Sequence, residues 1–153
     1  MITTTKLRPY QIEAIEGIET AWRAHDSTLA VMATGTGKTD VFGDLIRRWL
    51  EFGRAMVVAH REELIDQAAQ RVGAIAGCRA DVEMADRRAG DGTMWDGAPL
   101  VVASVQSLNS ADRLARFDPM DYAMLVIDEA HHATADTYRR VIAGGDESVT
   151  RCN

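Results

Sequence analysis

The residues best suited to do chemistry lie at positions 32–39, between an apolar run and an amphipathic segment, where Met32 is followed by Ala-Thr-Gly-Thr-Gly-Lys-Thr. Glycines let a backbone curl so that its N–H groups surround phosphate oxygens, and a following helix adds a positive N-terminal dipole. Lys38 can reach the β- and γ-phosphates of a nucleoside triphosphate, and Thr39 can offer its hydroxyl to Mg²⁺. The predicted nucleotide-binding residues are Thr34, Gly35, Thr36, Gly37, Lys38 and Thr39.

This phosphate loop departs from the general pattern at one position. Met32 stands where the pattern has glycine. The alternative reading is a glycine-rich turn with a surface lysine. Gly-Lys-Thr between a strand-like run and a helix-like segment argues against that reading.

An acidic pair about 90 residues further along the chain supplies a second candidate group. Asp128 and Glu129 directly follow an apolar run, and a buried parallel strand delivers side chains to its carboxyl end, where ligands bind. Asp128 can then hold Mg²⁺, directly or through water, and Glu129 can act as general base toward the attacking water. Alone the pair fits a helix N-cap equally well; the upstream loop favours the metal site. The residues allow ATP or GTP, and the absence of a guanine-reading motif favours ATP.

The elements that must position these groups indicate an α/β fold of the P-loop type. Apolar runs without alternation are typical of a parallel sheet covered on both faces, and helix-like segments between them predict right-handed crossovers. Strands are expected at 29–32, 55–59, 80–84, 100–103 and 124–127. Helices are expected at 9–25, 41–49, 62–76 and 136–142. In the first helix, a stripe of Ile12, Ile15, Ile18 and Trp22 is predicted to be core.

Composition bounds the class of protein. The 153 residues fit one domain, and the net charge of −6 counts against a generic basic nucleic-acid binder. Binding through a few loops stays open, because backbone N–H groups also hold phosphates. There is no apolar run near 18 residues, so no membrane contact is expected. The two cysteines, Cys78 and Cys152, lack a metal-binding spacing, and with no export signal they predict a cytoplasmic protein.

The tetrad Asp-Glu-Ala-His at 128–131, together with the phosphate loop, resembles motifs II and I of DEAD/DEAH-type superfamily 2 helicases. The resemblance covers nearly all of residues 6–142. It implies a RecA-like ATP-binding motor domain that uses ATP and Mg²⁺ and contacts nucleic acid, with Lys38 and the acidic pair as catalytic residues. It also implies that Gln11, within Leu-Arg-Pro-Tyr-Gln at 7–11, hydrogen-bonds adenine, and that His131 links the nucleotide site to later motifs. The alternative for Gln11 is an exposed helix residue.

Two further segments look like nucleic-acid-contacting motifs of the same family, at 59–64 and 103–108. The resemblance implies nucleic-acid contacts for Arg61, Ser104 and Gln106. The subtype looks closest to the type III restriction-subunit and repair-helicase branch, which favours DNA over RNA. The alternatives are that Arg61 is an ordinary charge at a helix start and that Ser104 and Gln106 cap the helix after their strand.

The C-terminal part departs from the family pattern, because no apolar strand is visible at 144–153. We therefore expect a domain at 1–143, incomplete at its C-terminus, and a poorly ordered polar tail at 144–153. The second motor domain is missing, and unwinding needs two domains that close around ATP. The chain is thus expected to need that domain, or a partner chain, before it can unwind. Two alternatives stay open: a non-catalytic piece that retains nucleotide binding, and a P-loop enzyme unrelated to nucleic acid.

Overall fold

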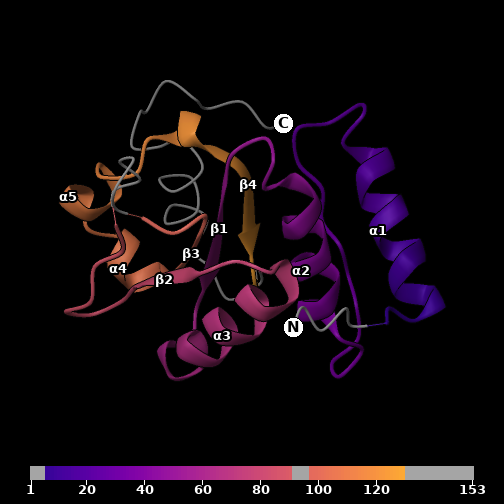
Figure 1. Cartoon of the computed structure of the whole chain (residues 1–153), viewed down its shortest axis with the longest axis horizontal. Coiled ribbons are helices and arrows are strands. Elements are labelled where there is room, and N and C mark those ends of the chain that lie inside the picture. The colour runs from indigo at the N-terminus through magenta and orange to yellow at the C-terminus, as the bar shows by residue number, and fades with distance from the viewer. Residues whose placement is uncertain (1–5, 91–96, 130–153) are drawn as a thin grey trace.

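A four-stranded sheet forms the centre of the computed structural model, which describes residues 6–90 and 97–129 (Figure 1). The strands are β1 (Arg54–Ala59), β2 (Ala80–Glu83), β3 (Leu100–Ser104) and β4 (Tyr122–Ile127). Their order in the sheet is β2-β3-β1-β4, and all three pairings are parallel. The predicted parallel α/β class is confirmed.

Helices cover both faces of this sheet (Figure 1). The longer ones are α1 (Pro9–Ala21), α2 (Lys38–Trp49) and α3 (Ile65–Ala76), the last preceded by the 3-10 turn η1 (Glu62–Leu64). The shorter ones are α4 (Val105–Leu108) and α5 (Ala111–Leu114), followed by the 3-10 turn η2 (Pro119–Asp121). Strands that leave the sheet at one edge and re-enter it in the same direction need such crossover elements.

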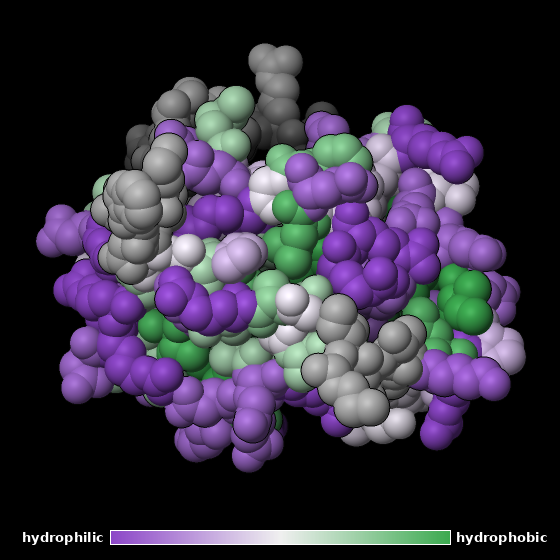
Figure 2. All heavy atoms as spheres, in the orientation of Figure 1, coloured by the Kyte–Doolittle hydropathy of each residue, from purple (hydrophilic) through white to green (hydrophobic). Residues whose placement is uncertain are grey.

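Alternate residues of the central strands feed two separate hydrophobic clusters. In β1, Ala55 and Val57 pack in the cluster shared with α1, α2 and α3. Met56 and Val58 pack in the second cluster, which contains residues of α4 and α5. This two-sided burial explains why the strands read as continuous apolar runs in the sequence. On the face shown in Figure 2, hydrophobic residues lie in the middle and again at the right side, with hydrophilic residues between and around them.

The strand predicted at 29–32 is wrong: this segment forms no strand, and Leu29 and Val31 are 76% and 86% exposed. A run of four apolar residues fixes hydrophobicity but does not supply a hydrogen-bonding neighbour. In the described sheet β4 is an outer strand, and residues 29–32 form no strand beside it. The approach to the phosphate loop is therefore an extended surface segment.

The first helix is shorter than predicted, ending at Ala21 instead of near His25. Its expected core stripe is only partly buried, because Ile15 is fully buried whereas Ile12 is 42% exposed. α1 packs mainly on α2, so one narrow face is covered. The helix predicted at 62–76 begins as a 3-10 turn before continuing as α3. The helix predicted at 136–142 and the tail at 144–153 lie outside the described residues.

Candidate nucleotide-binding site

The phosphate loop takes the backbone shape that its glycines allow. Gly35 and Gly37 have φ of 79° and 80°, the left-handed region that residues with a Cβ rarely adopt. The Thr36 hydroxyl donates to the carbonyl of Ala33 at 2.6 Å, which closes the turn. α2 begins at Lys38 with Gly37 as N-cap, so its first N–H groups are available to a phosphate. Thr39 is the second residue of this helix, and Thr34 is exposed at the outer part of the loop.

A side chain at Gly37 would also have to displace two neighbouring side chains. A Cβ built on it would lie 2.4 Å from Nε2 of Gln11 and 2.8 Å from Oδ2 of Asp40. At Gly35, by contrast, a Cβ would have nothing within 4 Å. The second glycine of the loop is therefore fixed by packing as well as by backbone conformation.

The side chain of Gln11 is hydrogen-bonded to the backbone of the phosphate loop. Its side chain is only 4% exposed, and its Nε2 donates to the carbonyl of Thr36 at 3.1 Å and to that of Gly37 at 3.4 Å. Its Oε1 accepts from the backbone N–H of Arg8 at 2.8 Å, and the Tyr10 hydroxyl reaches Thr36 O at 3.0 Å. Gln11 is thus a buried tether between the start of α1 and the phosphate loop, and its contact with adenine stays a prediction.

The acidic pair meets the loop across the carboxyl end of the sheet. Oε1 of Glu129 lies 3.8 Å from Nζ of Lys38, with both side chains about one-third exposed. Asp128 is the first residue after β4, and its N–H donates to the carbonyl of Val58 at 2.9 Å, which ties it to β1. The two motifs predicted from the sequence therefore face the same site.

The pKa of Asp128 is raised above its ordinary value. Burial of the carboxyl is the main cause, and the neighbouring charge of Glu129 adds to it. A backbone hydrogen bond from Glu129 and the charge of Lys38 act in the opposite direction. Two carboxylates held together in a partly buried place are an environment that a cation would relieve.

Sequence reasoning missed an ion pair behind the loop. Asp40, in the first turn of α2, is 9% exposed, and its Oδ1 accepts from Nη2 of Arg71 on α3 at 2.9 Å. An acidic residue in a first helical turn is a recognisable signal, since it complements the helix dipole. Arg71 could not be identified as its partner, because the contact depends on how α3 packs beside α2.

The residues predicted to contact nucleic acid lie where β1 and β3 end side by side, with Ala59 opposite Ser104. Arg61 is exposed just after β1. Gln106 is exposed, and its Nε2 donates to the carbonyl of His60 at 3.0 Å. Ser104 is fully buried and caps α4 by accepting from the N–H of Ser107 at 3.0 Å. Ser104 therefore caps the helix after its strand, as the alternative prediction had it. His131 lies outside the described residues.

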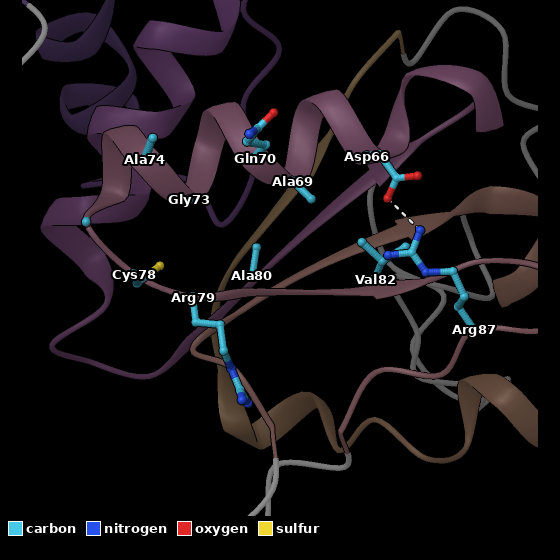
Figure 3. A pocket seen from close by; sticks show the side chains of 11 residues that line it. Asp66, Ala69, Gln70, Gly73, Ala74, Cys78, Arg79, Ala80, Val82 and Arg87 are labelled. Atoms are coloured by element: carbon cyan, nitrogen blue, oxygen red, sulfur yellow. Dashed lines mark hydrogen bonds and ion pairs between the residues drawn. The ribbon is translucent and has the colours of Figure 1, made fainter. Parts of the chain in front are cut away.

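A shallow groove of about 550 Å³ lies away from these groups, between α3 and β2 (Figure 3). Its polar lining includes Gln70 and Arg79, and an ion pair of 2.5 Å between Asp66 and Arg87 lies at one end. None of the predicted site residues lines it, so it is distinct from the nucleotide site.

Within residues 6–90 and 97–129, no helix is long and apolar enough to cross a membrane. Two solved structures share the fold, each with a TM-score of 0.69. One is a nuclease-deletion mutant of the Type ISP restriction-modification enzyme LlaGI in complex with a DNA substrate mimic (16% identity, 92% of this chain, 16% of that chain). The other is a hypothetical ATP-dependent RNA helicase from Sulfolobus tokodaii (18% identity, 93% of this chain, 44% of that chain).

Sequence comparison identifies relatives and a family. The chain is 30% identical to irc3 of Schizosaccharomyces pombe, which is named as a mitochondrial ATP-dependent helicase. The match covers 97% of this chain and 25% of irc3, so the chain spans about a quarter of that relative's length. Residues 4–150 match the model of the type III restriction enzyme res subunit. With nearly its whole length matched, the chain belongs to the type III restriction enzyme res subunit (ResIII) family.

Proposed function

We propose that this chain is the ATP-binding domain of a superfamily 2 helicase or translocase, which couples Mg-ATP hydrolysis to nucleic-acid binding. The observation that carries the proposal is the 3.8 Å approach of Lys38 Nζ to Glu129 Oε1, which brings the phosphate loop and the acidic pair to one site. Loop N–H groups and Lys38 bind the β- and γ-phosphates. Glu129 lies where it can take a proton from water attacking the γ-phosphate.

The donor set fits a divalent cation. The Thr39 hydroxyl and the Asp128 carboxylate are oxygen ligands of the kind Mg²⁺ prefers; Thr39 follows Lys38 at the start of α2, and Asp128 directly follows β4. Bound there, Mg²⁺ would neutralise charge on the β- and γ-phosphates. The pKa of Asp128 is raised mainly by burial and further by the adjacent charge of Glu129, and a cation bound there would favour the ionised carboxylate again.

The nucleic-acid part of the proposal concerns the ends of β1 and β3. Arg61 is exposed there, and Gln106 is beside it in the fold. DNA is proposed over RNA, on the resemblance to the restriction-subunit and repair-helicase branch. Unwinding is proposed only for a larger assembly with a second motor domain, supplied by more of the same protein or by a partner chain. The cytoplasmic location stays a prediction.

A non-catalytic role with retained nucleotide binding is the second candidate. It keeps the phosphate loop as a nucleotide-binding element without assigning turnover to the chain alone. An arginine supplied by a second domain typically contributes a factor of about 10³–10⁵ in rate. Binding without turnover is therefore the outcome that this candidate predicts.

The test is the ATPase rate of the chain alone, with single-stranded DNA and with double-stranded DNA, and with matched RNA. The sequence has two lysines, so Lys38→Ala is the blank and Lys6→Ala, at an exposed position, is its matched control. Loss of the Lys38 charge is expected to weaken ATP binding by about 1.5–3 kcal/mol, roughly 10- to 150-fold.

DNA-stimulated turnover that Lys38→Ala abolishes and Lys6→Ala keeps supports the helicase proposal. ATP binding without turnover, measured by calorimetry, supports the non-catalytic candidate. Equal ATP affinity for Lys38→Ala and the unaltered chain would contradict both.

A further inference from the structure

One hydrogen bond joins the segment after β1 to the start of α4: Nε2 of Gln106 donates to the backbone carbonyl of His60 at 3.0 Å. We infer that Gln106 is a positioning residue that holds the backbone next to Arg61, so that the Arg61 guanidinium meets a phosphate of the nucleic acid. On this inference Gln106 does not contact the nucleic acid itself. The inference rests on the proposed function and gives these two residues separate roles.

Gln106 lies in α4, whose first turn is held in place by buried hydrogen bonds. The start of α4 is fixed by Ser104, which is fully buried, pairs in register with Ala59 and caps the helix. The Ser104 hydroxyl also donates to the hydroxyl of Ser107 at 2.9 Å, and Ser107 accepts from the N–H of Ala85 at 3.1 Å. Buried polar networks with satisfied partners rigidify their surroundings. The exposed amide of Gln106 therefore starts from a defined position.

The segment that Gln106 holds is less constrained. Arg61 has an extended backbone, with φ of −94° and ψ of 110°, and its side chain is exposed. Within the described part of the chain, no carboxylate forms an ion pair with Arg61. The hydrogen bond from Gln106 spans 46 positions of sequence, so it links the two strand ends instead of stabilising a local turn.

The negative charge around Arg61 makes the orientation of its guanidinium important for binding phosphate. Arg61 is followed directly by Glu62 and Glu63, both exposed, and the whole protein carries a net charge of −6. Diffuse attraction to a phosphate backbone is therefore weak at this place. A single guanidinium can still bind phosphate through its fixed fork of donors, but only if the backbone presents it correctly.

The experiment measures how binding of a fluorescein-labelled oligodeoxythymidine to the whole chain depends on salt, by fluorescence anisotropy. The slope of log K against log[salt] changes by about 0.7 for each phosphate contact on a single strand. Arg61→Ala should reduce the slope by about 0.7. Gln106→Ala and Gln106→Met, the second of similar length but without a donor, should reduce it by about the same 0.7, although glutamine has no charge.

The double variant with Arg61→Ala and Gln106→Ala should show no further loss, because both changes remove the same contact. Gln67→Ala, at an exposed position on α3, is the matched control and should keep the original slope. Thermal unfolding of Gln106→Met should match the unaltered chain, as expected for an exposed residue.

Weaker binding of the Gln106 variants with an unchanged slope would overturn the inference, because it would indicate a direct neutral contact. Unchanged binding would overturn it too. If Arg61→Ala itself keeps the original slope, or if the unaltered chain does not bind the oligonucleotide, the nucleic-acid interface under the proposed function is wrong instead.

Discussion

Nε2 of Gln11 donates a hydrogen bond to the carbonyl oxygen of Thr36 at 3.1 Å, so the start of the first helix holds the phosphate loop in place. The contact is partly buried, and Gln11 itself is only 4% exposed. A loop that must present its N–H groups to phosphate gains from such a tether, because its carbonyls are directed away from the ligand. The adenine contact predicted for Gln11 would involve the same side chain that shapes the loop.

Gln11→Ala is expected to reduce the free energy of unfolding by about 0.5–1.5 kcal/mol, since partly buried backbone groups of Arg8, Thr36 and Gly37 lose their hydrogen-bond partner. Comparing ATP with GTP separates the two roles of Gln11. If the side chain only shapes the loop, affinity for both nucleotides should fall by the same factor; if it also reads adenine, ATP should lose more. The readout is calorimetric titration, with exposed Gln67→Ala as control. Unchanged stability and affinity would show that the tether has no role.

Gly37→Ala should be more harmful than Gly35→Ala. Both positions have φ near 80°, so each substitution carries a left-handed cost of about 1–2 kcal/mol. Only at Gly37 does the new methyl group also meet Gln11 and Asp40. Urea unfolding and ATP titration of the pair should show a larger loss for Gly37→Ala in both measurements. Equal losses for the two variants would mean that the left-handed backbone conformation alone accounts for the cost of the substitution.

Glu129→Gln should keep ATP binding while lowering turnover by about 10²–10⁴, the usual contribution of a general base. Binding is kept because the ion pair between Lys38 and Glu129 is partly exposed and contributes little to stability. The measurement is single-turnover hydrolysis alongside a nucleotide-binding titration. Exposed Glu63→Gln serves as the control, and turnover equal to that of the unaltered chain would remove Glu129 from the proposed role.

Asp128→Asn should stabilise the fold at neutral pH while removing Mg²⁺-dependent turnover. The pKa of Asp128 is raised, mainly by burial, so the folded protein favours the protonated carboxyl. The free energy of unfolding therefore falls as the pH rises from about 3.8 through the folded-state pKa. Replacing the charge should recover about 1 kcal/mol or less at pH 7, typical of a stabilising change at a functional site.

That gain should shrink as the pH is lowered through the raised pKa of Asp128, because the carboxyl then becomes protonated in the folded protein. Urea unfolding at several pH values in the absence of Mg²⁺ measures this gain in the free energy of unfolding. Asp26→Asn, at an exposed position, is the control. A loss of stability at neutral pH would show instead that the charged form of Asp128 has a stabilising partner.

Much of the fold was predictable because it rests on local signals. Continuous apolar runs identified β1, β3 and β4, and the helix expected after the phosphate loop is present as α2. The strand predicted at 29–32 was wrong, because the hydrophobicity of these residues does not show whether a neighbouring strand is available to pair with them. Strand pairing is a non-local event, and four residues do not specify it.

For the site, the sequence by itself determined the chemistry: a glycine loop, Lys38, and the acids at 128 and 129. Only the tertiary structure decided which groups meet, because parallel strands bring distant residues to one edge of the sheet. It set Lys38 3.8 Å from Glu129, turned Gln11 into a buried tether, and directed Gln106 onto the carbonyl of His60. Such contacts depend on strand order and helix packing, which residue types and spacing do not encode.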